Sequence, residues 1–200
     1  MDPTAQRIVA LARKGPVQPA DLAAHGWARD WLHRLHRSGD LVRVSRGLYR
    51  AADAEPTEHA ALVEVSKRVP TAVIGLLSAL QYHELTTEAP HEVWILIPNR
   101  ARAPQLQYPK LHIVRASGTA ATHGVESARI EGVDVRVTSA AKTVADCFRY
   151  RDHVGLETAL EALRAYLGRS RRGRAVDALV EACQADRVLS VVRPYLEAMA

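Results

Sequence analysis

The chain has 200 residues, of which 48% are hydrophobic, and this composition is ordinary for one or two globular domains. Its longest apolar stretch, near residues 72–80, is far shorter than the roughly 20 residues of a membrane-spanning helix, and its start lacks a secretory pattern. We therefore expect a cytoplasmic protein with no membrane partner. Cys147 and Cys183 have no His or Cys neighbour at metal spacing, which predicts buried, reduced thiols.

Positive charge is concentrated at the start of the chain. Residues 1–50 hold nine of the 27 Lys and Arg but only four of the 22 Asp and Glu, so this segment alone accounts for the net charge of +5. Residues 51–200 hold 18 of each sign and are neutral overall. A charge excess confined to one short segment indicates a polyanionic partner, such as nucleic acid.

Three short helices are predicted in this basic segment. Asp2 and Pro3 form a helix start, and Gly15-Pro16 ends that helix. Pro19 opens a second helix over residues 20–24. A third is expected over residues 28–37, with Ala28, Trp31, Leu32 and Leu35 on its inward face.

Two short strands, residues 41–44 and 48–50, follow around Ser45-Arg46-Gly47, and the glycine allows the tight turn of a hairpin. Three helices followed by a basic hairpin predict a winged helix-turn-helix, in which the third helix enters the major groove of duplex DNA and the wing reaches a neighbouring phosphate or the minor groove. The expected DNA-binding residues are Arg29, His33, Arg34, Arg37, Arg43, Ser45, Arg46 and Arg50.

The rest of the chain predicts an α+β domain. Residues 1–52 form the winged helix, residues 53–57 a linker, and residues 58–200 a second domain with a small, mostly antiparallel sheet flanked by helices. Strands are expected over 92–97, 111–115, 126–130 and 133–137, the last two as a hairpin. Helices are expected over 58–68, 72–82, 139–149, 154–167, 175–184 and 186–198.

Catalytic and cofactor motifs are not found in the sequence: it contains no GxGxxG, GxxxxGK[ST], GxSxG or HExxH pattern. We therefore expect no enzymatic activity, no cofactor and no metal; His33 and His36 have helical spacing but lie among arginines. A basic run after Gly168 has two interpretations, a secondary phosphate-binding patch or a solvated turn. Its arginines are Arg169, Arg171, Arg172 and Arg174.

Five segments, taken in order, resemble the AbiEi family of antitoxins, the transcription-regulator half of AbiE-type abortive-infection systems. They are LVRVSRGLYR at 41–50, IGLLSAL at 74–80, VWILIP at 93–98, VTSAAKTVADCF at 137–148 and VRPYLE at 192–197. The first carries an Arg-Gly-x-Tyr ending like that of the family's wing, and the fourth has a Lys-Thr pair before Val-x-Asp.

This resemblance implies a winged helix that binds operator DNA and represses its own operon. It also implies a C-terminal domain that antagonises a nucleotidyltransferase-like toxin, without a stable complex, in defence against phage. Some related chains carry an additional nuclease-like region that this sequence does not show, which favours a non-enzymatic role.

Two other functions stay open at this level. A stand-alone regulator would sense a small molecule through a deep apolar pocket in the second domain. A nucleic-acid-processing enzyme would use the winged helix for targeting and would need a carboxylate cluster or metal site in the second domain.

Overall fold

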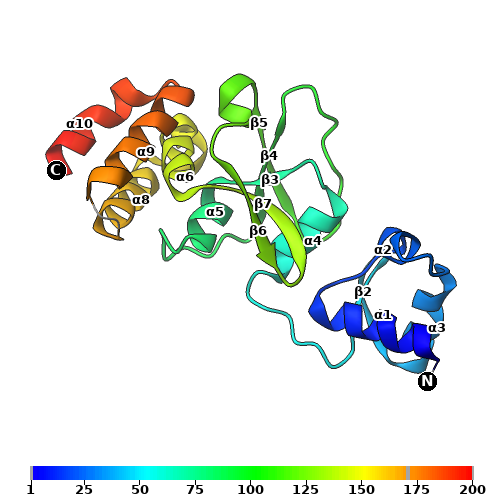
Figure 1. The fold of residues 1–200 in the computed structure, drawn as a ribbon. Coiled ribbons are helices and arrows are strands. Elements are labelled where there is room, and N and C mark those ends of the chain that lie inside the picture. Colours follow the sequence, from blue (N-terminus) through cyan, green and yellow to red (C-terminus); the bar gives the residue numbers. More distant parts are fainter. Residues whose placement is uncertain (1, 170–171, 200) are drawn as a thin grey trace. The chain divides into compact units, whose positions relative to one another are not determined.

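The structure is a computed structural model that describes residues 2–169 and 172–199. The chain divides into two compact units. The first comprises residues 1–68 with 129–134, and the second comprises residues 69–128 with 135–200. Figure 1 gives the order of the elements along the chain.

The first unit opens with three helices: α1 (Pro3–Lys14), α2 (Pro19–Ala24) and α3 (Asp30–Ser38). Asp2 caps α1 by accepting a hydrogen bond from the Thr4 N–H at 2.7 Å, as its position before Pro3 predicts. Gly39 ends α3 in the left-handed conformation with φ of 86°, where a side chain would be strained. These helices confirm the predicted order, although α3 begins two residues later than expected and leaves Ala28 exposed before it.

The wing consists of β1 (Leu41–Ser45) and β2 (Leu48–Ala51), which pair antiparallel through a turn at Arg46 and Gly47. Gly47 has φ of 76°, as this tight turn requires. Val17, between α1 and α2, adds an antiparallel bridge to Tyr49. Ile8, Leu22, Leu32, Leu35, Leu41 and Tyr49 belong to one buried cluster, which fixes the helices on the hairpin. The helix α4 (Ala60–Arg68) completes this unit.

A five-stranded sheet in the order β5-β4-β3-β7-β6 forms the frame of the second unit, although the end of β6 and the start of β7, within residues 129–134, are grouped with the first unit. Its strands are β3 (Val73–Ile74), β4 (Val93–Pro98), β5 (Leu111–Ala116), β6 (Val125–Ile130) and β7 (Val133–Thr138). Glu131 and Gly132 join β6 to β7 with positive φ at both residues, the geometry of a two-residue hairpin turn. The predicted α+β class is confirmed.

The pairing in this sheet is mixed and not mostly antiparallel as expected. β3 pairs antiparallel with β4, but β4 with β5 and β3 with β7 run parallel. For β4 and β5 the reason lies in their connection. Residues 99–110 carry the chain from the end of β4 back to the level of its first residue, so β5 runs in the same direction as β4. Sequence periodicity gives the strands but not the direction of each pair.

Helices cover the sheet of the second unit: α5 (Leu76–Tyr82), α6 (Ala140–Arg149), α7 (Arg151–Val154), α8 (Leu156–Arg169), α9 (Arg172–Ala185) and α10 (Leu189–Met199). A 3-10 turn, η1 (Gly118–Ala121), follows β5. The α6 helix contacts α5, α8 and α9, and Figure 1 shows α6 and α8 to α10 gathered on one side of the sheet. Phe148, Leu163, Leu179 and Val192 are fully buried in their shared core.

Two predicted helices are divided in the structure. The expected 72–82 helix begins as strand β3, and α5 starts only after Gly75, because an apolar segment that opens with β-branched residues fits a buried strand equally well. The expected 154–167 helix breaks at Gly155, whose φ of 87° separates α7 from α8. No helix in the described part of the chain is long and apolar enough to cross a membrane.

Candidate nucleic-acid interface

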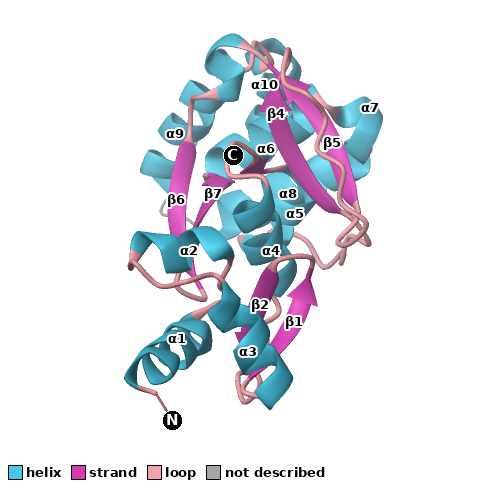
Figure 2. Cartoon of the chain, turned by 90° about the vertical axis from the view of Figure 1, so that its right-hand side faces the viewer, coloured by secondary structure: helices cyan, strands magenta, loops and turns pink. Residues whose placement is uncertain are grey.

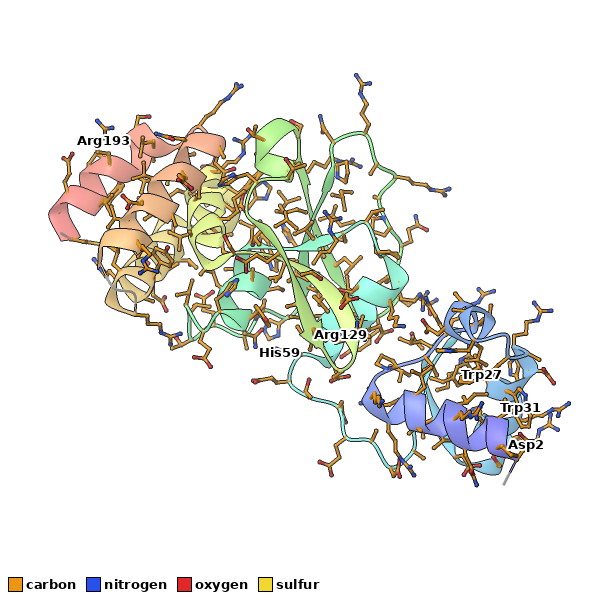
Figure 3. The ribbon with its side chains drawn as sticks, in the orientation of Figure 1. Asp2, Trp27, Trp31, His59, Arg129 and Arg193 are labelled. Carbon is orange, nitrogen blue, oxygen red and sulfur yellow. The ribbon has the colours of Figure 1, made fainter. Side chains whose placement is uncertain are left out.

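The α3 helix has one buried face and one charged face. Leu32 and Leu35 are buried, whereas His33, Arg34 and Arg37 are exposed on the opposite side. Trp31 is half-buried and packs against the core of the unit, and Figure 3 labels it together with Trp27. Because the apolar positions fix the helix in the core, the charged positions are free to meet a partner.

A groove of about 650 Å³ separates α3 from the wing and contains four of the predicted residues. Arg29 and His33 line it from the α3 side, and Arg43 and Arg46 line it from the hairpin. Its floor includes Leu32 and Tyr49, which belong to the buried core. The lining also contains Asp30, but its cations outnumber this carboxylate, and such an excess of positive charge suits an anionic backbone.

Arg34 is held on the α3 surface just beside this groove. Its guanidinium lies 3.0 Å from the Asp30 carboxylate one turn earlier and 5.3 Å from the centre of the Trp31 ring. The side chains of Arg34 and Asp30 are 67% and 53% exposed, so this ion pair is well solvated and weak. A phosphate or a base edge can displace Asp30 at little cost.

The α4 helix holds the tip of the wing in place, although no local sequence pattern connects the two. Arg68, the last residue of α4, donates to Ser45 Oγ at 3.2 Å and to the Arg46 carbonyl at 3.1 Å. The preceding Lys67 Nζ lies 2.8 Å from both oxygens of Asp21 on α2. This contribution of α4 was not predicted, since Arg68 and the wing are more than 20 residues apart.

The remaining predicted residues occupy different surroundings. Ser45 is half-buried beneath Arg68, and Arg50 is half-buried with an Nε that has no hydrogen-bond partner in the described chain. His36, which is not among the predicted DNA-binding residues, has its Nδ1 3.0 Å from the Leu41 carbonyl oxygen; a carbonyl only accepts, so this nitrogen carries the proton and ties α3 to β1. The groove thus brings together Arg29, His33, Arg43 and Arg46, and leaves the other four outside it.

The predicted secondary patch is described only in part. Arg169 ends α8 and donates to the His83 carbonyl at 3.1 Å, with Glu84 Oε2 at 3.3 Å. Arg174 is exposed near the start of α9. Arg171 lies outside the described residues, and Arg172 is described only as the first residue of α9.

A second charged feature lies inside the core of the second unit. Lys142 Nζ contacts the Asp146 carboxylate one turn later on α6 and lies 3.1 Å from Asp186, which follows α9. All three side chains are at most 1% exposed. We call these residues the buried cluster; sequence analysis missed it, although a Lys and an Asp four residues apart on an apolar helix were a usable signal.

Burial controls the protonation of this cluster. Desolvation raises the pKa of Asp146 to about 7, against the lowering effect of Lys142, and it also raises the pKa of Asp186. One ammonium facing two carboxyl groups is neutral only when one of these groups keeps a proton. The neighbouring thiols are inert for the same reason: burial raises the pKa of Cys147 and brings that of Cys183 to about 12.

A hollow of about 410 Å³ is lined by Leu189, Ser190, Arg193, Pro194 and Glu197, all from α10, so it is not the deep apolar pocket of a sensor. Within residues 2–169 and 172–199, no group of three or more His, Cys, Asp or Glu side chains is arranged to hold a metal ion.

Part of the sequence and the fold as a whole are similar to known proteins. Residues 6–52 match a family model described as "Transcriptional regulator, AbiEi antitoxin". The fold is similar to that in the crystal structure of the RV2827C protein from Mycobacterium tuberculosis, with a TM-score of 0.53 and 16% identity. That similarity covers 100% of this chain and 83% of the other, and at this identity it speaks for the fold alone. No curated protein matches the sequence.

Proposed function

We propose that this chain, whose winged helix belongs to the AbiEi antitoxin transcriptional regulators, binds the operator DNA of its own operon and represses it. The observation that carries the proposal is the groove between α3 and the wing, which gathers Arg29, His33, Arg43 and Arg46. The family match covers the elements that build this groove, and a transcriptional regulator of this family is not a class of enzyme.

In this proposal α3 is the recognition helix. The first turns of a recognition helix meet base edges in the major groove, which assigns base contacts to Arg29, His33 and Arg34. Arg37 lies in the last turn of α3 and contacts a flanking phosphate. Asp30 sits between these cations, and it leaves Arg34 when that side chain moves to the DNA.

The wing supplies contacts to the sugar–phosphate backbone. Arg43 and Arg46 face the groove from the hairpin, so a DNA strand beside α3 passes between two basic walls. Arg46 in the turn reaches an adjacent phosphate or the minor groove. Ser45 and Arg50 are half-buried. We propose that they stabilise the hairpin in addition to their predicted place on the DNA-binding surface.

The finer role follows from the family resemblance. We propose that residues 1–52 carry DNA binding and that residues 58–200 antagonise a nucleotidyltransferase-like toxin without forming a stable complex. The second unit fits a role of this kind in having its own core and sheet. The side chains of its buried cluster are at most 1% exposed, and the cluster is a structural element in this proposal, not a reaction centre.

Two readouts in the same cells test both activities. The full chain is expressed beside a reporter driven by the promoter of its own operon, together with the neighbouring toxin gene. The Arg34→Ala, Arg46→Ala double variant should lose repression and keep rescue from the toxin. The Arg164→Ala, Arg193→Ala variant removes the same charge from exposed positions of the second unit and should keep both activities.

Each result has a distinct meaning. Repression that persists in the first variant would contradict the assignment of operator binding to α3 and the wing. Rescue that disappears together with repression, in a variant of unchanged thermal stability, would mean that protection acts through transcription. A neighbouring gene product that is not toxic would remove the antitoxin role and leave the regulator.

A further inference from the structure

The connection between the parallel strands β4 and β5 differs from the usual crossover. Parallel neighbours need a connection of about a dozen or more residues, and this connection most often contains a helix. Here residues 99–110 contain no helix or strand, and Figure 2 shows them as loop throughout. This connection is at the upper end of ordinary loop lengths, and longer loops without regular structure are often functional. We call residues 99–110 the crossover loop.

Charge is strongly segregated around this loop. Between Glu92 and Glu126 the sequence contains no Asp or Glu at all, but it contains Arg100, Arg102, Lys110 and Arg115. The neutral balance of residues 51–200 is thus an average that hides a basic stretch. Arg100, Arg102 and Lys110 are exposed and form no ion pair with a described carboxylate.

The first part of the loop is held in a defined path. Arg115 on β5 donates to the carbonyls of Asn99 at 2.6 Å and Ala101 at 2.9 Å. The Asn99 N–H donates to the Ala116 carbonyl at 3.0 Å, and the Ala101 N–H closes a turn on Pro98 at 2.9 Å. These bonds fix the backbone on which Arg100 and Arg102 stand, so both guanidinium groups are presented from an ordered segment.

An exposed aromatic side chain accompanies the cations. Tyr108 is 71% exposed, which places it among the few large apolar side chains outside the core, and no described ring packs on it. The parallel pairing of β4 with β5 places Arg100 and Arg102 near the end of β4, and Tyr108 and Lys110 near the start of β5. An exposed tyrosine and unpaired cations along one loop are a combination that suits single-stranded nucleic acid, since bases stack on the ring while cations follow the phosphates. Recognition of a duplex by its base edges takes a helix or a two-stranded ribbon in the groove, which this loop is not.

We propose that the crossover loop binds single-stranded nucleic acid along its length, with a base stacked on Tyr108, a neighbouring phosphate on Lys110, and further phosphates of the same strand on Arg100 and Arg102 at the other end of the loop. This site is separate from the operator interface on α3 and the wing, and it does not depend on it. RNA and single-stranded DNA share the chemistry of stacking and phosphate contact, so the test includes both.

The experiment uses the full chain with the Arg34→Ala and Arg46→Ala changes, which weaken the winged helix and are present in every variant compared, so that its remaining contribution is constant. Fluorescence anisotropy measures binding of short labelled oligo(U) and oligo(dT) over a series of salt concentrations. The loop variant adds Arg100→Ala, Arg102→Ala and Lys110→Ala. Its charge-matched control adds Arg164→Ala, Arg187→Ala and Arg193→Ala, which are exposed cations of the same unit; Figure 3 labels Arg193 on α10.

The loop variant should lower the slope of log affinity against log salt by about 2, since each phosphate contact on a single strand contributes about 0.7. Tyr108→Ala should weaken binding roughly 5- to 150-fold and leave this slope unchanged, because stacking is not ionic. The control should keep most of the affinity. A preference for oligo(U) over oligo(dT) identifies RNA as the ligand, and the opposite preference identifies single-stranded DNA.

Three results would overturn the proposal. The first is an equal loss in the loop variant and its control, which reports bulk charge only. The second is unchanged oligonucleotide binding in both the loop variant and the Tyr108→Ala variant. The third is unchanged binding together with lost rescue from the toxin, which assigns the loop to a protein surface. Operator binding by the chain with an intact winged helix is measured separately, so failure here leaves the proposed repressor untouched.

Discussion

The two units of this protein place their charged residues in opposite ways. The first unit places its excess arginines on the surface of α3 and the wing, around a groove with an apolar floor. The second unit buries Lys142, Asp146 and Asp186 in its core, at no more than 1% exposure, and keeps a basic loop outside. The net charge of a segment therefore indicates a partner only where its charged residues are exposed. The excess of +5 in residues 1–50 pointed to the winged helix. The net charge of zero in residues 51–200 concealed both a buried cluster and a basic surface.

The largest expected effect comes from breaking the buried cluster. Lys142→Met leaves two carboxyl groups in the core without their cation, and removing one partner of a buried ion pair costs about 3–5 kcal/mol of stability. Lys14→Met is the control, because Lys14 is exposed on α1. Urea unfolding of both variants measures the difference. Equal midpoints would mean that the cluster is solvated and that the contrast between the units is false.

The next effect concerns the outer face of α3. Arg29→Ala, Arg34→Ala and Arg37→Ala remove the cations that we assign to base edges and flanking phosphates. A change that removes base reading should cost roughly 1–3 kcal/mol and relax preference at one operator position. Arg46→Ala on the wing should weaken all sequences similarly or alter a preference for A·T pairs. Competition among operator variants checks this, and unaltered preference in all three α3 variants would mean that another element reads the DNA.

Stability should fall as the pH rises from about 3.8 to about 7 because of the buried cluster. The folded chain keeps the Asp146 proton up to a pKa of about 7, whereas an unfolded Asp releases it near its ordinary value of 3.8. Between these values the folded state binds more protons, so the free energy of unfolding decreases with rising pH, by at most about 1.4 kcal/mol per pH unit. Asp146→Asn should flatten this decrease relative to the wild type. Identical slopes in a pH series of unfolding curves would contradict the buried proton.

The smallest effect separates the shape of the wing from its charge. Arg68→Ala removes the hydrogen bonds to Ser45 and Arg46 and should weaken operator binding by about 1 kcal/mol, roughly fivefold. If Arg68 only positions the wing, the salt dependence of binding stays the same. A salt slope that falls by about one contact would instead show that Arg68 itself touches a phosphate.

Local features of the fold were predictable, because their causes are close together in sequence. Asp2-Pro3 begins α1, Gly39 ends α3, and the Arg46-Gly47 turn closes the wing. The direction of strand pairing was not predictable, since it depends on the path of residues 99–110. The apolar segment 72–82 is also divided at Gly75 into a strand and a helix, although the hydrophobicity of the segment alone suggested a single helix.

The candidate site divides in the same way. Periodicity placed His33, Arg34 and Arg37 on the outer face of α3, which the structure agrees with. Contacts between distant residues were missed, namely Arg68 with the wing and Lys142 with Asp186. Such pairs become visible only when the chain is folded, because nothing in their local sequence refers to the partner.

The most direct measurement is operator binding by the full chain in a gel-shift titration with DNA from upstream of its own operon. The comparison is between the wild type, the Arg34→Ala, Arg46→Ala variant and the charge-matched Arg164→Ala, Arg193→Ala variant. We expect specific binding to be lost in the first variant and retained in the second. Equal weakening of both, or full binding by the first, would contradict the assignment of DNA recognition to α3 and the wing.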